Sequence, residues 1–409
     1  MLNLNYICEQ TITKTTMKTI KDINFKGKKA LIRVDFNVPL NKEFQVTDTT
    51  RIKAAKPTIL KVLEDGGAAV LMSHLGRPKG AEAKFSLGNI VEKVTEVLGV
   101  QAKFVDACVG GKAEAAVAAL KPGEVLILEN LRFHKEETAG DLAFSEQLSK
   151  LGDVYVNDAF GTAHRAHAST TVVAQFFQEK VAGYVMEAEL VNADKVLKSA
   201  SKPFTSIMGG AKVSDKLLII EKLLDVADNI IIGGGMSYTF AKAAGGQIGN
   251  SLCEDDKLDY VKELQAKATA KGVNLIFPVD SLIADDFSND ANTQVVEKGC
   301  IPADWEGLDI GPASQKLFAD VIKNSKTVLW NGPMGVFEIP AFEKGTVAVA
   351  NAVKEATLGG AFSLIGGGDS AAAINNLGFG DDVSYVSTGG GALLEYMEGK
   401  VLPGVQAIS

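Results

Sequence analysis

Short apolar runs alternate with stretches of helical periodicity along nearly the whole chain, and this alternation restricts the fold more than any other feature. Apolar runs of this length, bounded by turn residues, are typical of buried β-strands. In the first half the expected strands are Ala30–Val34, Ala69–Met72, Lys103–Val105, Val125–Leu128 and Val154–Val156, and the expected helices are Arg51–Glu64, Leu87–Leu98, Ala113–Leu120 and Leu142–Lys150. Strands that alternate with helices form parallel sheets covered by helices, so we predict an α/β protein.

The same alternation starts again after a break near the middle of the 409 residues. A helical pattern over Met186–Ser199 ends at Lys202-Pro203, where proline disfavours helix in the residue before it. The strands expected beyond this break are Phe204–Met208, Asn229–Ile232, Asn274–Phe277, Thr327–Leu329, Phe362–Ile365 and Val383–Val386. The chain is long enough for two domains at roughly 100–200 residues each.

We therefore predict two Rossmann-like parallel-sheet lobes joined by a helical hinge. The expected divisions are a disordered, Thr-rich extension at 1–16 (with Met17 as an alternative start), a first lobe at 17–185, a hinge helix at 186–202, a second lobe at 203–390 and a C-terminal segment at 391–409 that returns to the first lobe.

Composition excludes several classes of protein. With 42 basic and 50 acidic residues the net charge is −8, which does not favour binding to nucleic acid or to an anionic membrane. We see neither an apolar run long enough to span a membrane nor an N-terminal secretory signal, and we expect a cytoplasmic protein. The four cysteines are far apart, without the spacing of a zinc site or a disulfide framework.

The arginines and histidines are confined to the first 167 residues. All five arginines (Arg33, Arg51, Arg77, Arg132 and Arg165) and all four histidines (His74, His134, His164 and His167) lie there. Four of these arginines stand in motifs that we expect at one edge of the first sheet, together with His74. Guanidinium groups bind carboxylates and phosphates in a bidentate way, and four of them in one small site require a multiply charged anion.

The second half carries glycine turns instead. Four expected strands run directly into glycine and then into a helix, at Gly209-Gly210, Gly233-Gly234-Gly235, Gly366-Gly367-Gly368 and Gly389-Gly390-Gly391. The carboxyl ends of parallel strands meet at one edge, so these turns should present helix N-termini to a phosphorylated or nucleotide ligand. No G-x-x-x-x-G-K-[ST] occurs, and Gly366–Ala371 fits a dinucleotide fingerprint only weakly because it comes late in its lobe.

Taken together, the motifs resemble those of phosphoglycerate kinase from about Lys18 to Val405. They are R-V-D-F-N-V-P from Arg33, S-H-L-G-R-P from Ser73, D-A-F-G-T-A-H-R-A-H from Asp158, G-G-A-K-V-S-D-K from Gly209, W-N-G-P-M-G-V-F-E from Trp330 and G-G-G-D-S from Gly366. The resemblance implies a two-lobed monomer that transfers a phosphoryl group between 1,3-bisphosphoglycerate and ADP, giving 3-phosphoglycerate and ATP, with Mg²⁺.

The resemblance also assigns residues. It implies a 3-phosphoglycerate site made of Asp35, Asn37, Arg51, His74, Leu75, Gly76, Arg77, Arg132 and Arg165, and a nucleotide site made of Gly210, Lys212, Lys216, Gly234, Asn331, Glu338, Gly367, Gly368, Asp369 and Ser370. Within the second site, Lys212 and Lys216 would bind phosphates from one face of a helix start, Glu338 the ribose, and Asp369 the metal with its nucleotide. Arg51 and Lys212 are the expected contacts of the transferring phosphoryl group. Ser370 stands where threonine is as familiar, and its hydroxyl is kept.

The chemistry fits a site without a general base, because the attacking carboxylate is already ionised at neutral pH. Positioning and charge stabilisation then remain as the tasks of the protein. Two alternatives stay open here: a non-catalytic two-lobed receptor for anions or nucleotides, and a nicotinamide oxidoreductase. Neither explains both the arginine motifs and the glycine turns.

Each key residue also has an ordinary structural interpretation. Asp35 could pair with Arg33 along the strand, His74 could be a buried structural histidine, and Lys216 could pair with Asp215 in solvent. In addition, Glu338 could be a charge at a helix N-terminus, and Asp369 could be the N-cap of a helix over Ala371–Asn376.

Overall fold

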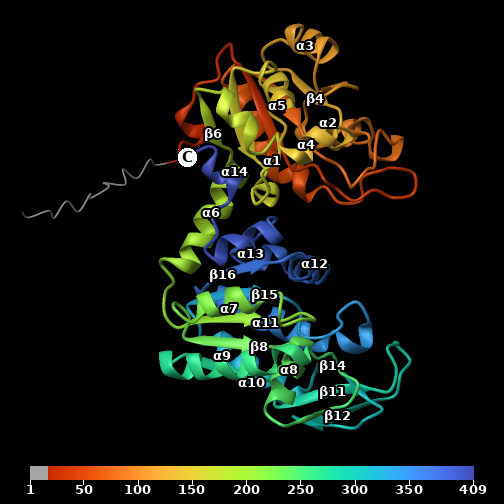
Figure 1. Cartoon of the computed structure of the whole chain (residues 1–409), viewed down its shortest axis with the longest axis vertical. Coiled ribbons are helices and arrows are strands. Elements are labelled where there is room, and N and C mark those ends of the chain that lie inside the picture. The colour runs from red at the N-terminus through yellow and green to blue at the C-terminus, as the bar shows by residue number, and fades with distance from the viewer. Residues whose placement is uncertain (1–16) are drawn as a thin grey trace, which may run out of the picture. The chain divides into compact units, whose positions relative to one another are not determined.

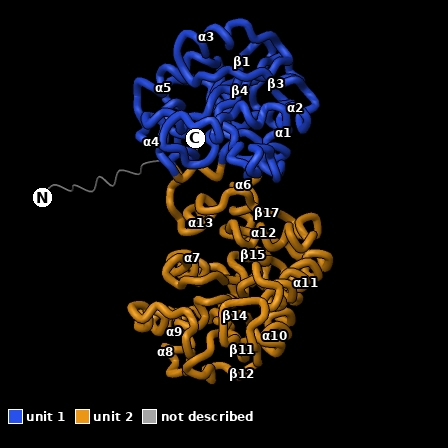
Figure 2. Tube along the Cα trace, turned by 90° about the vertical axis from the view of Figure 1, so that its right-hand side faces the viewer, with its two compact units in different colours: residues 1–159, 165–186, 403–409 blue, residues 160–164, 187–402 orange. Residues whose placement is uncertain are grey.

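The structure, a computed structural model, describes residues 17–409 and divides into two compact units. Unit 1 comprises the described residues up to Ala159, with Arg165–Met186 and Pro403–Ser409; unit 2 comprises Phe160–His164 and Glu187–Leu402 (Figure 2). The expected disordered extension at 1–16 lies outside the described residues.

Unit 1 is built on a six-stranded parallel sheet with the strand order β3-β4-β2-β1-β5-β6. Figure 1 shows the helices and strands of the chain coloured by residue number. Its strands are β1 (Lys29–Val34), β2 (Ala68–Met72), β3 (Ala102–Val105), β4 (Val125–Leu128), β5 (Val154–Asp158) and β6 (Lys180–Ala182). Its helices are α1 (Thr50–Glu64), α2 (Val91–Leu98), α3 (Gly111–Ala118), α4 (Lys135–Ala139), α5 (Leu142–Ser149) and the short α14 (Pro403–Gln406). Five of the six strands were predicted from the sequence, and β6 was missed.

The two faces of this sheet are both buried, as expected for a parallel sheet. One face carries Ile32 and Leu71 and packs against α1 and α2 in a continuous apolar core. Side chains alternate along a strand, so the opposite face carries Leu31 and Arg33, and both are buried there as well. A buried arginine on a sheet face needs polar partners, which the neighbouring loops provide.

Helix α6 (Tyr184–Leu197) crosses the border between the units, which lies between Met186 and Glu187. It begins two residues before the expected Met186, because Oδ1 of Asp158, at the end of β5, accepts a hydrogen bond from the Val185 backbone N–H at 2.8 Å. A carboxylate at this position satisfies one of the free N–H groups of the first turn.

Unit 2 repeats the architecture with the strand order β10-β8-β7-β15-β16-β17, again all parallel. The strands are β7 (Phe204–Met208), β8 (Asn229–Ile232), β10 (Asn274–Ile276), β15 (Thr327–Asn331), β16 (Phe362–Gly366) and β17 (Tyr385–Val386). The helices are α7 (Leu217–Leu223), α8 (Met236–Ala243), α9 (Leu258–Lys271), α10 (Pro312–Lys323), α11 (Lys344–Leu358), α12 (Gly368–Asn376) and α13 (Gly391–Met397). Two parallel sheets of six strands confirm the predicted fold class.

Unit 2 also contains strands that the sequence did not predict. They are β11 (Asp280–Ala284), β12 (Thr293–Glu297) and β14 (Glu306–Ile310) in an antiparallel sheet, and β9 (Gln247–Ile248) with β13 (Cys300–Ile301) in a parallel pair. Strand β12 is largely exposed and β11 begins with the polar pair Asp280-Ser281. A search for apolar runs misses such strands.

Candidate functional site

Polar loops follow the carboxyl ends of the strands of unit 1 and surround a depression of about 710 Å³. We call it the basic depression, because its lining includes Arg77, Arg132, Arg165, Lys79 and Lys135, together with His134 and His167. The only acid in its lining is Glu136. Three of the four arginines predicted to bind an anion therefore lie around one opening.

The fourth predicted arginine, Arg51 in the first turn of α1, is held by the loop that follows β1. Its Nη1 donates to the Asn37 backbone oxygen at 2.9 Å and lies 3.2 Å from Asp35 Oδ2. Asp35 thus forms an ion pair with Arg51. The alternative interpretation, in which Asp35 pairs with Arg33, is wrong. The side-chain Oδ1 of Asn37 accepts from the Gly76 backbone N–H at 2.8 Å, which joins the loops after β1 and β2.

The loop after β2 has no room for a side chain at Gly76. This residue has φ +63°, and a Cβ there would lie 2.4 Å from the Phe85 ring. Its carbonyl oxygen accepts from Arg132 Nη1 at 2.6 Å, which joins the loops after β2 and β4. The side chain of the neighbouring Leu75 is buried in the core, and Asn130 binds both its backbone N–H and its carbonyl oxygen.

The electrostatics of the basic depression are those of a site that concentrates positive charge. Burial, with smaller contributions from the charges of Arg165, Arg33 and Arg77, lowers the pKa of Arg132 to about 10, and the charge of Glu137 opposes this shift. Burial also places the pKa of His74 well below its usual value, with added contributions from nearby arginines. Groups that repel each other in this way are stabilised by a bound anion.

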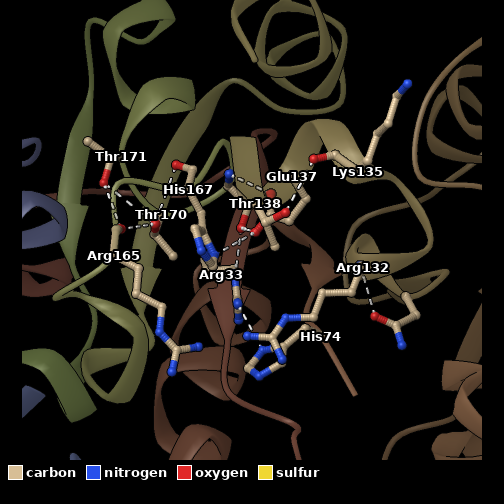
Figure 3. Close-up of polar contacts among 12 residues, drawn as sticks. Arg33, His74, Arg132, Lys135, Glu137, Thr138, Arg165, His167, Thr170 and Thr171 are labelled. Atoms are coloured by element: carbon tan, nitrogen blue, oxygen red, sulfur yellow. Dashed lines mark hydrogen bonds and ion pairs between the residues drawn. The ribbon is translucent and has the colours of Figure 1, made fainter. Parts of the chain in front are cut away.

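Figure 3 shows the polar contacts around His74 and Arg132, including residues that the sequence did not single out. Arg33, Glu137 and Ser169 are all buried and joined by hydrogen bonds. Arg33 belongs to a recognised motif, but no sequence pattern indicated that a glutamate and a serine far along the chain would contact it.

Glycine turns of unit 2 surround a second pocket of about 360 Å³, which we call the glycine pocket. Its lining contains the predicted residues Gly210, Gly234, Glu338 and Asp369. The other lining residues are mainly apolar or small and include Gly235, Leu252, Phe287, Leu308, Met334 and Val336. Leu252 and Phe287 are each 58% exposed, which is unusual for large apolar side chains and suits a flat apolar ligand.

The glycines here allow the turns after β7, β8 and β15 to touch. A Cβ on Gly234, which has φ +63°, would lie 2.5 Å from the Gly210 backbone N. The Gly210 N–H donates to the Pro333 oxygen at 3.0 Å, and the Gly210 oxygen accepts from the Met236 N–H. Three turns are thus packed main chain against main chain.

The half-buried Lys216 and the buried Asn331 form a polar pair beside these turns. The Lys216 ammonium donates to Asn331 Oδ1, and burial lowers the pKa of Lys216, while the charges of Asp215, Asp369 and Glu398 oppose the shift. The Asn331 Nδ2 is buried without a hydrogen-bond partner in the part of the chain that is described. Ser370 Oγ accepts from the Gly332 N–H at 2.5 Å and connects α12 to the turn after β15.

Two interpretations of residues in unit 2 are wrong in detail. Lys212 and Lys216 do not share a helix face, because α7 begins only at Leu217 and Lys216 is its N-cap residue. The segment before α7 is instead held by Glu254, which accepts from the backbone N–H and the hydroxyl of Ser214.

The other concerns α12. Gly367 is the N-cap of α12, and Asp369 lies inside its first turn, so the N-cap interpretation of Asp369 is wrong. The turn at Gly389–Gly391 does not line the glycine pocket; Glu189 of α6 accepts from Ser387 Oγ and from the Thr388 N–H just before it.

Within residues 17–409, no group of three or more His, Cys, Asp or Glu side chains could hold a metal ion by itself. The same residues include no helix with the length and apolar character needed to cross a membrane.

Comparison with known proteins identifies relatives along nearly the whole chain. The family model described as phosphoglycerate kinase matches residues 20–400. The phosphoglycerate kinase of Porphyromonas gingivalis is 54% identical over 415 residues, covering 95% of this chain and 99% of that protein. The enzyme of Clostridium botulinum is 52% identical over 395 residues, covering 96% and 98%.

A solved structure agrees with these relatives. The structure of phosphoglycerate kinase from Coxiella burnetii superimposes with a TM-score of 0.87 at 37% identity and covers 96% of this chain and 98% of that one. The chain belongs to the phosphoglycerate kinase family, whose members transfer a phosphoryl group between 1,3-bisphosphoglycerate and ADP in glycolysis.

Proposed function

We propose that the basic depression with Arg51, His74 and the loop after β1 binds 3-phosphoglycerate and 1,3-bisphosphoglycerate, and that the glycine pocket binds ADP and ATP. The observation that carries the first assignment is the convergence of arginines. One opening is lined by Arg77, Arg132 and Arg165. Arg51 lies close enough to His74 for its charge to help lower the pKa of that histidine. Such a cluster fits a ligand that carries both a carboxylate and a phosphate.

The glycine pocket fits a nucleotide by its shape and its main-chain groups. Its apolar side chains Leu252, Phe287 and Val336 suit a base, and the carboxylate of Glu338, at the same pocket, suits ribose hydroxyls. The glycine turns and the ammonium of Lys216 suit phosphates. Gly367, Gly368 and Ser370 at the start of α12 would extend this phosphate site, because α12 presents its N-terminus there.

Phosphoryl transfer to a carboxylate needs no base, so the protein acts by positioning and by stabilising charge. Arg51, from unit 1, and Lys212, from unit 2, would contact the transferring group. Lys212 is exposed and lies in the loop between β7 and α7, without secondary structure of its own. The backbone of Lys212 is therefore not held in a helix.

Asp369 fits a Mg²⁺ ion that arrives with the nucleotide. It lines the glycine pocket in the first turn of α12, and no cluster of three or more acids or other ligands accompanies it within residues 17–409. One carboxylate with the phosphates of the nucleotide is a common way to hold Mg²⁺. When bound, the ion would neutralise part of the phosphate charge.

The two ligands would be bound by different units, so transfer requires that the units bring them together. We propose that α6, which crosses the unit border, is part of the hinge. Small-angle scattering should show compaction only when both ligands are present, and an unchanged radius of gyration would contradict this part of the proposal. We further propose a monomer, since each site is formed by residues of one chain, and a cytoplasmic location.

A coupled assay tests the proposed sites and the metal together. The full chain should consume ATP in the presence of 3-phosphoglycerate and Mg²⁺, and chelation of the metal should abolish the reaction. Calorimetry should then show that Arg132→Ala loses 3-phosphoglycerate binding but keeps ADP binding. Loss of both ligands in this variant, with the fold intact by circular dichroism, would contradict separate sites. Sedimentation of the native protein tests the monomer, and fractionation of the source cells tests the location.

A further inference from the structure

A chain of buried hydrogen bonds leads from α4 to His74. Glu137, in α4, accepts from the Ser169 backbone N–H at 2.9 Å and from the Ser169 hydroxyl at 2.6 Å. The Ser169 hydroxyl in turn accepts from Arg33 Nε at 2.9 Å. Arg33 Nη2 lies 3.1 Å from His74 Nδ1 (Figure 3). Four side chains from separate parts of unit 1 thus form one continuous relay.

Every member of this relay is buried. Ser169 is fully inaccessible, Arg33 and Glu137 are each 1% exposed, and His74 is 4% exposed. A buried guanidinium and a buried carboxylate are each costly alone, so each compensates the charge of the other through the Ser169 hydroxyl. The third nitrogen of Arg33 donates to the Val34 carbonyl oxygen, which fixes the plane of the guanidinium. Arg33 therefore has a defined orientation toward His74.

The contact between Arg33 and His74 determines where the imidazole carries its proton. A guanidinium has only donors, so His74 Nδ1 must be the acceptor. Burial and the charges of Arg33, Arg132, Arg165 and Arg51 keep the pKa of His74 well below its usual value, so the ring is neutral at physiological pH. A neutral imidazole that accepts at Nδ1 carries its single proton on Nε2.

We propose that the Glu137–Ser169–Arg33 relay is a positioning device that holds His74 in the Nε2–H tautomer, as a neutral hydrogen-bond donor to the 3-phosphoglycerate site. This inference rests on the proposed function of the basic depression. Every oxygen of a carboxylate or a phosphate is an acceptor, so the Nδ1–H tautomer would turn a lone pair toward the ligand. Glu137, Ser169 and Arg33 act through His74, and they need not touch the substrate.

A neutral donor has a specific advantage at this place. Arg132 is close enough to His74 for its charge to affect the imidazole, and the two lie together in Figure 3. Another cation here would add to the repulsion that already lowers the pKa of Arg132. Glu137 also lies 3.9 Å from His167 Nδ1, so the same carboxylate faces a second histidine of the basic depression.

The tautomer is measured directly by long-range ¹H–¹⁵N correlation spectra of the full chain with ¹⁵N-labelled histidine, in which the protonated and unprotonated ring nitrogens have distinct shifts. Assignment uses His74→Gln. We expect His74 to be neutral with the proton on Nε2, and to remain so across neutral pH. A proton on Nδ1, or a charged ring at neutral pH, would overturn the proposal without any variant.

The relay is tested by Ser169→Ala, which removes the bridging hydroxyl but keeps the backbone N–H that Glu137 accepts. We expect a mixture of tautomers at His74, a KM for 3-phosphoglycerate raised about five- to tenfold, and a kcat and a KM for ATP within about twofold. The matched control is Ser145→Ala, because Ser145 is also fully buried in unit 1 but its hydroxyl donates only to the Asp141 backbone oxygen. The control should change neither the tautomer nor the KM.

Arg33→Met provides a second variant in case Ser169→Ala does not fold, and it should shift the tautomer further. A spectrum and a KM that match Ser145→Ala in both variants would overturn the relay. Failure of the proposed function looks different: 3-phosphoglycerate added to the unaltered protein would then leave the His74 signals unmoved, whatever their tautomer.

Discussion

The two units build their proposed anion sites on nearly the same scaffold but by opposite means. Both sites lie at the carboxyl edge of a six-stranded parallel sheet. Unit 1 surrounds its site with guanidinium groups on long side chains, whereas unit 2 brings glycine turns so close that main-chain atoms touch. Charge dominates in the first and shape in the second.

The two kinds of site differ in what they require of the residues around them. A cluster of cations needs compensating groups, and unit 1 provides Asp35 beside Arg51 and Glu137 behind Arg33. Main-chain amides are uncharged and need no counter-charge. The closely packed glycine turns leave no space for a side chain, as the clash of a Cβ at Gly234 shows. We therefore expect substitutions to impair the site in unit 1 by removing charge and the site in unit 2 by adding atoms.

The largest effect is expected from Arg51→Ala. It removes a charge that would act on the transferring phosphoryl group and leaves Asp35 as an unpaired carboxylate near the substrate. Turnover should fall by about 10²- to 10³-fold, while ADP affinity changes by less than about twofold. Lys53→Ala, which removes an exposed charge from the same helix, is the control and should be close to neutral. An equal loss of ADP affinity would contradict separate roles for the two sites.

In unit 2, we expect an added side-chain atom to impair nucleotide binding by steric clash. Gly234→Ala would place a Cβ 2.5 Å from the Gly210 N, and the turn must move. We expect the KM for ADP to rise by about 10- to 100-fold, with the KM for bisphosphoglycerate nearly unchanged. Gly245→Ala is the matched control, because Gly245 also has positive φ (+87°) but has no atom within 4 Å of the added Cβ. It should cost about 1 kcal/mol of stability and leave kinetics unchanged. Similar kinetics in both variants would refute the steric argument.

Lys216→Ala tests the half-buried ammonium beside the glycine turns. Lys216→Ala should raise the KM for the nucleotide by about tenfold, since the ammonium is desolvated and paired with Asn331. Lys222→Ala, an exposed position on α7, serves as the control. A nucleotide KM equal to that of the control would contradict a role in nucleotide binding and would favour the alternative that Lys216 only pairs with Asp215 in solvent.

The last prediction concerns stability instead of kinetics and is shared by the two units. Each unit buries one carboxyl whose pKa burial raises to about 7: Asp158 in unit 1 and Asp309 in unit 2. The folded state keeps a proton that the unfolded chain releases above about pH 4, so stability falls as pH rises toward 7. Each group should contribute a loss of about 2 kcal/mol between pH 5 and pH 7.

Urea unfolding at these two pH values measures the loss. Asp158→Asn and Asp309→Asn should each reduce the pH dependence, and the double variant should reduce it most. Variants that keep the full pH dependence would show that these carboxyls do not titrate in this range.

The sequence predicted the scaffold well because its signals are local. Apolar runs mark the strands, and the motifs stand where those strands end, so Arg51, Arg77, Arg132 and Arg165 could be expected at one edge. The glycine-rich segments likewise predicted the turns around Gly210 and Gly234. The family match explains why the activity could be read from the same motifs.

What the sequence missed depends on contacts between distant residues. Glu137 and Ser169 have no motif of their own, and only the fold brings them to Arg33. Leu252 and Phe287 are ordinary apolar residues until the structure places them at the rim of a pocket. The i, i+4 spacing of Lys212 and Lys216 was misleading because Ser214 binds Glu254 and delays the start of α7.

Unit 1 is completed by Pro403–Ser409, although the chain builds nearly all of unit 2 between Glu187 and Leu402. Asn157, at the end of β5, donates to the Gly404 oxygen, and Ile408 is buried. During translation, the ribosome must therefore finish unit 2 before unit 1 can acquire the contacts made by Pro403–Ser409. A nascent chain released a few residues early would carry a complete second unit attached to an unfinished first one.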